Sequence, residues 1–329
     1  MRNLSCYLVI VGIMSVIFVG CAPHAPHDNP LDPESHTGKS DGTLSGKILI
    51  LNSITRGISG ALVTIEGTTL AELTAADGSF NFPDAPSGNV TVLVAKASFK
   101  TDTLKLNLFV GGNLDTVTHL DALPQVSGPQ VATSDIDQWY PGPVYTAAIS
   151  ATVTDPDGFL DVDTVYATID SLAFGMNHTT GDNYQVTINA DSLPDQDLQW
   201  IIGKEFNVVA VDHENGVEIS SGFYATRIIE SEPNPTSPTE GLIITTHFPT
   251  FDWDRASVSF AATYQLQVVS LAGGTQTPIW SQSGFSPATE SFNFPDSLAS
   301  GNYYWTVAVV DQFGNSCRSR EAAFTVPSP

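Results

Sequence analysis

A chain of 329 residues, of which 42% are hydrophobic, is long enough to fill two or three separate hydrophobic cores. Its 35 acidic side chains outnumber its 12 lysines and arginines, which gives a formal net charge of −23 at neutral pH. Because no basic stripe is present that would neutralise phosphates, nucleic acid is excluded as a partner. The charge is compatible with calcium binding, with basic protein partners, or simply with solubility.

Residues 1–20 predict a signal peptide. Arg2 supplies a basic start, and residues 7–20 are apolar except for one serine, a run shorter than the ~20 residues that span a membrane. The run ends in Phe-Val-Gly at residues 18–20, directly before Cys21. This junction resembles the lipobox of bacterial lipoproteins, with phenylalanine in place of the usual leucine. The resemblance implies that Cys21 is acylated, with palmitate among its chains, and anchors the protein; the alternative is an ordinary signal peptide followed by an incidental cysteine.

Cysteine usage fits export. Cys6 leaves with the signal peptide and Cys21 would carry lipid, so Cys317 is the one cysteine of the folded body. An intramolecular disulfide and a cysteine-based zinc site are then excluded, and hydrophobic cores have to hold the modules together. Ala22 stands where an aspartate would resemble an inner-membrane retention signal. This predicts an outer-membrane lipoprotein of the cell envelope. The sequence does not indicate whether it faces the periplasm or the cell surface.

Residues 21–42 are expected to form an extended tether. Four prolines between residues 22 and 33 remove backbone donors and favour solvated, extended chain. From residue 43 to residue 123 apolar residues recur with a period of two, as at Val90, Val92 and Val94. This pattern predicts short strands with one buried face.

The segment 43–123 also resembles the carboxypeptidase regulatory-like domain. The match runs in order through residues 46–48, 58–65, 74–82 and 86–88. The resemblance implies a transthyretin-like fold of seven strands, grouped with carbohydrate-binding-like folds, that serves envelope proteins as a non-catalytic module. Val90 stands where the family usually has tyrosine, which changes one core position and leaves the expected fold intact.

Two further sandwiches are expected over residues 124–231 and 232–329. Strands and turns recur in the first at the spacing of an immunoglobulin-like sandwich, and the second resembles a fibronectin type III module. Residues 206–212 and 305–311 form a weak internal repeat, since both are apolar strands that end in aspartate with a glycine soon after. The expected fold class is therefore all-β: tandem antiparallel β-sandwiches joined by proline-rich links such as residues 231–238.

No catalytic motif is recognisable in the sequence. It contains no His-Glu-x-x-His and no Gly-x-Ser-x-Gly, and its nearest approach to a phosphate-binding loop, at residues 42–48, is one residue short and lacks the hydroxyl after the lysine. Carboxylates are abundant, but acid–base chemistry needs two of them in one cleft with separated pKa values. We therefore expect no enzyme activity and no cofactor, with calcium as the open case.

Five aspartates of the second sandwich are the best candidates for a metal site: Asp155, Asp157, Asp161, Asp163 and Asp212. Loops that follow the second and sixth strands of such a sandwich emerge at the same pole, so these carboxylates are expected to converge there. Calcium takes roughly 6 to 8 oxygen ligands, mainly from carboxylates and carbonyls. The alternative is that Asp155 caps a turn in which Gly158 supplies the positive φ.

Aromatic rings near predicted turns are candidates for stacking on sugar faces: Trp139, Tyr140, Trp200 and Trp280. The alternative for Trp280 is an ordinary half-buried strand residue. The two remaining tryptophans occupy alternating strand positions and are expected in a core: Trp253 and Trp305.

Together these features predict a non-enzymatic lipoprotein of the cell envelope, anchored to the membrane by its N-terminal lipid. Its β-sandwich modules are expected to bind protein partners or to act as spacers. A glycan-binding protein of the cell surface is the alternative, and an accessory subunit of an envelope hydrolase is the third hypothesis. An exposed aromatic patch near Trp139 or Trp280 would favour the second. A cleft with buried, perturbed carboxylates would favour the third.

Overall fold

The computed structural model describes residues 41–328. The predicted signal peptide, the predicted lipidation site Cys21 and the tether up to residue 40 lie outside the described residues. Within the described range, no helix is long and apolar enough to cross a membrane. The chain divides into two compact units. The first contains the described residues up to Leu49, Ser53–Ala97 and Thr101–Leu120, and the second contains Ile50–Asn52, Ser98–Lys100 and the chain from Asp121 onward.

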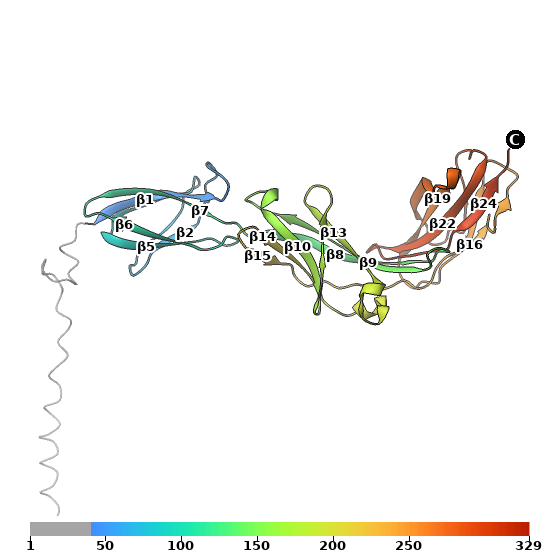
Figure 1. The fold of residues 1–329 in the computed structure, drawn as a ribbon, viewed down its shortest axis with the longest axis horizontal. Coiled ribbons are helices and arrows are strands. Elements are labelled where there is room, and N and C mark those ends of the chain that lie inside the picture. The colour runs from blue at the N-terminus through green and yellow to red at the C-terminus, as the bar shows by residue number, and fades with distance from the viewer. Residues whose placement is uncertain (1–40, 329) are drawn as a thin grey trace, which may run out of the picture. The chain divides into compact units, whose positions relative to one another are not determined.

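The first unit is built from two sheets, drawn in blue to teal in Figure 1. One has the order β4 (Ser79–Ala85), β1 (Gly42–Ile50), β7 (Asn113–Leu120). The other has the order β3 (Ala71–Leu73), β2 (Leu62–Ile65), β5 (Gly88–Ala95), β6 (Asp102–Leu108). Along β5, Val90, Val92 and Val94 are buried while Leu93 is 40% exposed, so the predicted period of two is confirmed. The three-stranded and four-stranded sheets agree with the strand number that the family resemblance implies.

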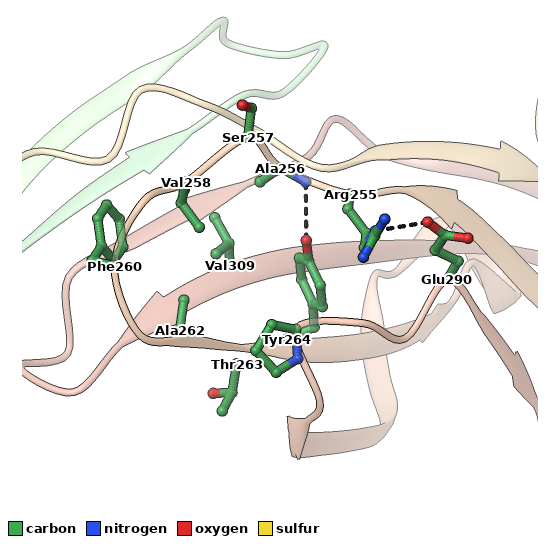
Figure 2. Close-up of a pocket in the computed structure, with 11 residues that line it drawn as sticks. Arg255, Ala256, Ser257, Val258, Phe260, Ala262, Thr263, Tyr264, Glu290 and Val309 are labelled. Atoms are coloured by element: carbon green, nitrogen blue, oxygen red, sulfur yellow. Dashed lines mark hydrogen bonds and ion pairs between the residues drawn. The ribbon is translucent and has the colours of Figure 1, made fainter.

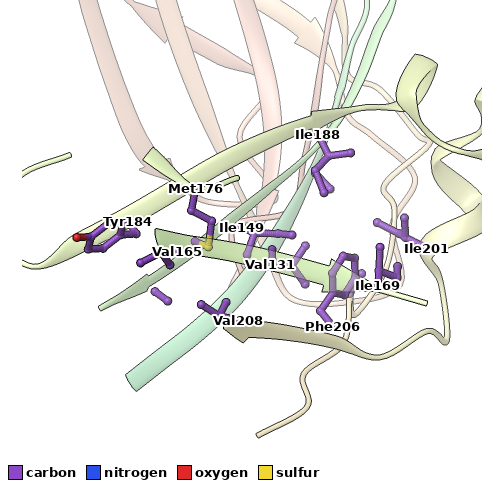
Figure 3. Packing of buried hydrophobic residues seen from close by; sticks show 14 of the residues in the cluster. Val131, Ile149, Val165, Ile169, Met176, Tyr184, Ile188, Ile201, Phe206 and Val208 are labelled. Carbon is purple, nitrogen blue, oxygen red and sulfur yellow. The ribbon is translucent and has the colours of Figure 1, made fainter. Parts of the chain in front are cut away.

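The second unit begins with a sandwich whose sheets enclose one hydrophobic cluster (Figure 3). One sheet has the order β11 (Leu172–Gly175), β10 (Val162–Ile169), β14 (Phe206–Asp212), β15 (Val217–Ile219). The facing strands have the order β12 (Asn177–His178), β13 (Asn183–Asn189), β9 (Val144–Thr154), β8 (Gln125–Ile136). Ile149 and Ile188 from the latter pack with Val165, Phe206 and Val208 from the former. Short 3-10 helices connect β13 to β14: η3 (Ala190–Ser192), η4 (Pro194–Gln196) and η5 (Leu198–Ile201).

A further sandwich follows in the same unit. Its smaller sheet has the order β16 (Asn234–Ser237), β18 (Thr250–Asp254), β21 (Ser291–Asn293). The facing strands are β23 (Ser316–Arg318), β22 (Gly301–Asp311), β19 (Ala262–Ser270), β20 (Thr277–Phe285), β24 (Ala322–Val326) and β17 (Leu242–Ile243), with η6 (Ala272–Gly274) between β19 and β20. Trp253 and Trp305, which were expected in a core, are 2% and 0% exposed. The indole Nε1 of Trp305 donates a hydrogen bond of 2.7 Å to the carbonyl of Pro238.

A parallel strand pair joins these two sandwiches into one ten-stranded sheet, because β23 pairs with β8. The expected all-β fold class of tandem, mainly antiparallel sandwiches is confirmed, and this parallel pair adds to it. The segment 231–238, expected as a link, contains strand β16, which pairs with β18. Pro235 is accommodated there because β16 is an edge strand, where one side of the backbone needs no partner.

A buried asparagine connects the two sandwiches at this junction. The Asn315 side chain is 0% exposed, and its Oδ1 accepts a hydrogen bond of 2.9 Å from the Thr133 amide of β8. Its Nδ2 donates to Thr226 Oγ1 at 2.7 Å and to Asp311 Oδ2 at 2.9 Å. Each polar atom of this amide is therefore paired across or beside the junction.

We expect Asn315→Ala to lower the free energy of unfolding of the second unit by about 2–4 kcal/mol, because buried partners lose their hydrogen bonds. Urea denaturation of the protein measures this difference. Asn177→Ala, on the exposed strand β12, is the matched control and should change stability by less than about 0.5 kcal/mol. Equal effects of the two substitutions would show that Asn315 does not hold the junction.

Candidate metal centre

Carboxylates of the second unit converge at one pole of its first sandwich: Asp121, Asp155, Asp157, Asp161, Asp212 and Glu214. The loop after β9 carries two of them, and the 3-10 helix η2 (Phe159–Asp161) ends in a third. Strand β14 ends at Asp212, which pairs with Val162 at the start of β10. Asp161 directly precedes β10, so the antiparallel pairing of β10 with β14 places Asp161 beside Asp212 at the end of β14.

These carboxylates form three overlapping groups. The groups are Asp121 with Asp212 and Glu214, Asp121 with Asp157 and Asp161, and Asp155 with Asp161 and Asp212. Within each group, one oxygen per residue lies within 4.8 Å of the others. Two ligands of one calcium ion lie at most about 5 Å apart, because each lies about 2.3–2.6 Å from the ion. Each group therefore meets the spacing condition for a shared cation.

Backbone amides hold one oxygen of several carboxylates in place. Asp157 Oδ2 accepts a hydrogen bond of 2.6 Å from the Ala122 amide, and Asp155 Oδ1 accepts one of 2.8 Å from the Asp157 amide. Asp212 Oδ1 accepts one of 2.6 Å from the Gly216 amide. These bonds fix the orientation of the side chains and leave the second oxygen of each available.

The available oxygens are buried without a hydrogen-bond partner among the described residues: Asp121 Oδ1 and Oδ2, Asp155 Oδ2, Asp157 Oδ1, Asp161 Oδ2, Asp212 Oδ2 and Glu214 Oε2. Asp161 and Asp212 are only 6% and 2% exposed. An ionised carboxylate that is buried without a partner is costly, so such a group takes up a proton or a cation. Lys100 Nζ lies 3.9 Å from Asp121 Oδ2, and one ammonium group cannot balance the cluster.

The internal repeat provides a comparison within the chain. Strand β22 ends at Asp311 as β14 ends at Asp212, and each Oδ1 accepts a hydrogen bond from the amide four residues later, Asn315 at 3.0 Å and Gly216 at 2.6 Å. The second oxygen of Asp311 accepts from the Asn315 side chain at 2.9 Å and lies 3.4 Å from Arg227 Nε. Gly216 occupies the position of Asn315 in the other copy, and there Asp212 Oδ2 has no hydrogen-bond partner in the described part of the chain. The second aspartate oxygen of this turn is thus paired with protein donors in one copy and without a hydrogen-bond partner among the described residues in the other.

The crowded, buried setting also shifts the acidity of the cluster. Burial raises the pKa of Asp155 to about 6 and the pKa of Asp157 to about 7, and neighbouring carboxylates act in the same direction. Burial, followed by the charges of Asp212 and Glu214, raises the pKa of Asp121 to about 6. In the absence of a cation, these groups hold protons close to neutral pH.

Four of the five predicted aspartates belong to this cluster, and Asp163 lies apart from it. The pairing register of β10 shifts at Asp163, whose side chain is 53% exposed with Oδ1 3.9 Å from Nε2 of His213. Sequence reasoning missed Asp121, which lies before the expected boundary at residue 124. It also missed Glu214, although its position two residues after Asp212 in the same turn was a usable signal.

The candidate rings Trp280 and Trp200 are both half-buried. Trp280 stacks on Phe292 with ring centroids 5.3 Å apart and an interplanar angle of 20°. The ammonium group of Lys204 lies 4.0 Å from the centroid of the Trp200 ring. Each ring thus has one face in contact with the protein.

Trp139 and Tyr140 are exposed to 71% and 90%. The guanidinium group of Arg320 lies 4.4 Å from the centroid of the Trp139 ring, and the indole Nε1 donates to the Glu321 carbonyl at 3.2 Å. Tyr140 and one face of Trp139 are therefore the surface that stacking on a ligand would use.

The last sandwich contains a pocket of about 480 Å³ (Figure 2). Arg255 and Glu290 in its wall form an ion pair of 2.7 Å, and the Tyr264 hydroxyl accepts a hydrogen bond of 3.0 Å from the Ala256 amide. The charged groups of the wall are thus paired with each other, in contrast to the carboxylate cluster.

Raised pKa values predict a specific pH dependence. An unfolded aspartate has a pKa of ~3.9, and these groups have higher pKa values in the folded state. Their contribution to stability is therefore complete below pH ~3.9 and is lost as the pH rises through about 6–7. In chelator, the melting temperature should therefore fall as pH rises from about 5 to about 7. In saturating calcium the part of this loss that comes from the cluster should disappear, because the ion replaces the protons. Asp135, whose pKa burial also raises to about 6, acts equally in both buffers. Identical pH profiles in calcium and chelator would contradict this account.

No known family model matches the sequence, and no curated protein matches it. Solved structures that resemble the chain include the FN1–FN3 domains of chicken CNTN1, with 10% identity over 88% of this chain and 96% of theirs and a TM-score of 0.33. Fibronectin(III)-like modules of Clostridium thermocellum CbhA show 14% identity over 62% and 93%, with a TM-score of 0.29. A DUF3823 family protein from Bacteroides ovatus shows 12% identity over 56% and 97%, with a TM-score of 0.25. At such values the likenesses carry no information about function.

Proposed function

We propose that this protein is a non-enzymatic, calcium-binding β-sandwich protein of the bacterial cell envelope. Bound calcium stabilises the first sandwich of the second unit, strands β8 to β15, which we call the middle sandwich. The observation that carries the calcium assignment is Asp212 Oδ2. It is buried and has no hydrogen-bond partner within residues 41–328, whereas the equivalent oxygen of Asp311 accepts a hydrogen bond from Asn315. A position that a protein donor fills in one copy of the repeat is left for a cation in the other.

The chemistry of the ligands favours calcium among the common cations. The three groups contain carboxylates alone, without histidine or cysteine, which suits hard cations rather than zinc or copper. Magnesium demands near-octahedral geometry at about 2.0–2.1 Å and tends to keep its waters, whereas calcium accepts crowded carboxylates in flexible arrangements. Several buried, unpartnered oxygens in one place fit the second description.

The same burial argues against an acid–base role for the cluster. A catalytic carboxyl group has to reach a substrate, but Asp161 and Asp212 are 6% and 2% exposed. Calcium coordinated by the cluster would connect the loop after β9, the helix η2 and the end of β14. Its effect would be to make this pole of the sandwich rigid, which suits a module that spaces or presents other surfaces.

Location and partners complete the proposal. The Gly-Cys junction at Cys21 supports an outer-membrane lipoprotein held by its N-terminal lipid. Envelope proteins are the partners we propose for the sandwiches. A glycan ligand is the second candidate, supported by the exposed ring of Tyr140 beside Trp139.

Calcium should raise the thermal stability of the second unit. An ion that binds the folded state alone adds about 2.7 kcal/mol at 100 times its dissociation constant. Differential scanning calorimetry in calcium, in magnesium and in chelator measures the effect, and the shift should be largest in calcium.

Two substitutions test which residues are responsible. Asp212→Asn should clearly reduce the calcium-dependent shift, because it removes a buried ligand without changing side-chain size. Asp163→Asn, which makes the same change at a carboxylate outside the cluster, should leave the shift unchanged. If calcium and chelator give the same melting temperature for the unmodified protein, the proposal of a calcium-binding protein is wrong.

Membrane anchoring is tested separately. Cys21→Ser should move the protein from the membrane fraction to the soluble fraction, because a serine accepts no lipid and the usual three acyl chains hold a protein firmly. Cell fractionation and intact mass spectrometry read the outcome, with Cys317→Ser as the control that should stay in the membrane. Unchanged membrane retention together with an unchanged mass for Cys21→Ser would refute lipidation at this residue.

A further inference from the structure

The carboxylate cluster is larger than one ion needs. Its six carboxylates would carry six negative charges when ionised, and Lys100 is the nearby ammonium group. A single divalent ion together with Lys100 would leave three of these six negative charges uncompensated in a buried place. Among the described residues, moreover, the cluster forms three groups of three and no larger group within the same spacing.

The way the groups overlap shows how the charge is distributed. Asp121, Asp161 and Asp212 each belong to two groups, and they are the most buried members at 9%, 6% and 2% exposure. Asp155, Asp157 and Glu214 each belong to one group. The cluster thus has a buried centre of shared carboxylates and a rim of carboxylates that are not shared.

Asp121 has the features of a bridging ligand. Both of its oxygens are buried and without a hydrogen-bond partner, whereas Asp212 has one oxygen held by the Gly216 amide. The two groups that contain Asp121 have no other member in common: one adds Asp212 and Glu214, and the other adds Asp157 and Asp161. One oxygen of Asp121 is therefore available for each group.

From this arrangement we propose that the cluster binds two calcium ions that share Asp121. This inference rests on the proposed calcium binding and specifies its stoichiometry. One ion lies among Asp121, Asp212 and Glu214, and the other lies among Asp121, Asp157 and Asp161. Two ions bring four positive charges to six carboxylates, which together with Lys100 leaves the site close to neutral.

Isothermal titration calorimetry and native mass spectrometry of the complete exported chain, carrying Cys21→Ser so that it needs no detergent, test the proposal with calcium chloride. The expected stoichiometry is two ions per chain. Glu214→Gln and Asp157→Asn each alter one group, so each should leave one ion tightly bound and weaken the other by at least the ~10-fold that loss of an outer-shell partner costs. Asp121→Asn should weaken both ions, and Asp163→Asn should weaken neither.

The outcomes separate this inference from the proposed function. One ion per chain in the unmodified protein, weakened alike by Glu214→Gln and Asp157→Asn, would overturn the two-ion site and leave calcium binding standing. No calcium bound at all would overturn both. Because Glu214→Gln and Asp157→Asn alter rim positions, they keep the test decisive even if Asp121→Asn does not fold, and circular dichroism of each variant checks folding.

Discussion

Electrostatic repulsion among carboxylates at one pole of the middle sandwich is the constraint on which the proposed calcium binding depends. Two ionised carboxylates about 5 Å apart repel each other by about 3 kcal/mol at an effective dielectric constant of about 20. Asp121, Asp161 and Asp212 each have such neighbours in two groups. This repulsion falls when protons or cations occupy the pole. In the proposed calcium-bound state the ion would also connect the loops that carry the ligands and make them rigid.

The internal repeat shows how one turn serves two purposes. In the last sandwich, Asn315 and Arg227 satisfy the aspartate at the end of β22, and the same asparagine bonds to Thr133 of β8. The turn thereby helps to join two sandwiches through a continuous sheet. In the middle sandwich a glycine replaces that asparagine, and the equivalent aspartate faces other carboxylates instead. The turn with asparagine thus forms part of a structural junction, and the turn with glycine forms part of a candidate ion site.

Local patterns predicted the fold well and the site in part. The period of two at Val90 to Val94, the buried Trp253 and Trp305, and the convergence of four aspartates all follow from strand periodicity and the shared pole of a sandwich. Asp163, which was expected to converge with them, lies apart because the strand register shifts there, and such a shift cannot be seen in residue spacing. Asp121 and the parallel pairing of β8 with β23 were missed because both depend on contacts between segments far apart in the chain. Such contacts leave no periodic trace in the sequence.

The most direct test of the central claim, that a cation organises this pole, is hydrogen–deuterium exchange in calcium and in chelator. Amides of Ala122, Asp157 and Gly216 donate to carboxylates of the cluster, so their protection reports whether the ligand loops are closed. Calcium should slow exchange at these amides by at least about tenfold and leave the amides of the last sandwich unchanged. Equal exchange at Ala122, Asp157 and Gly216 in the two buffers would contradict the account.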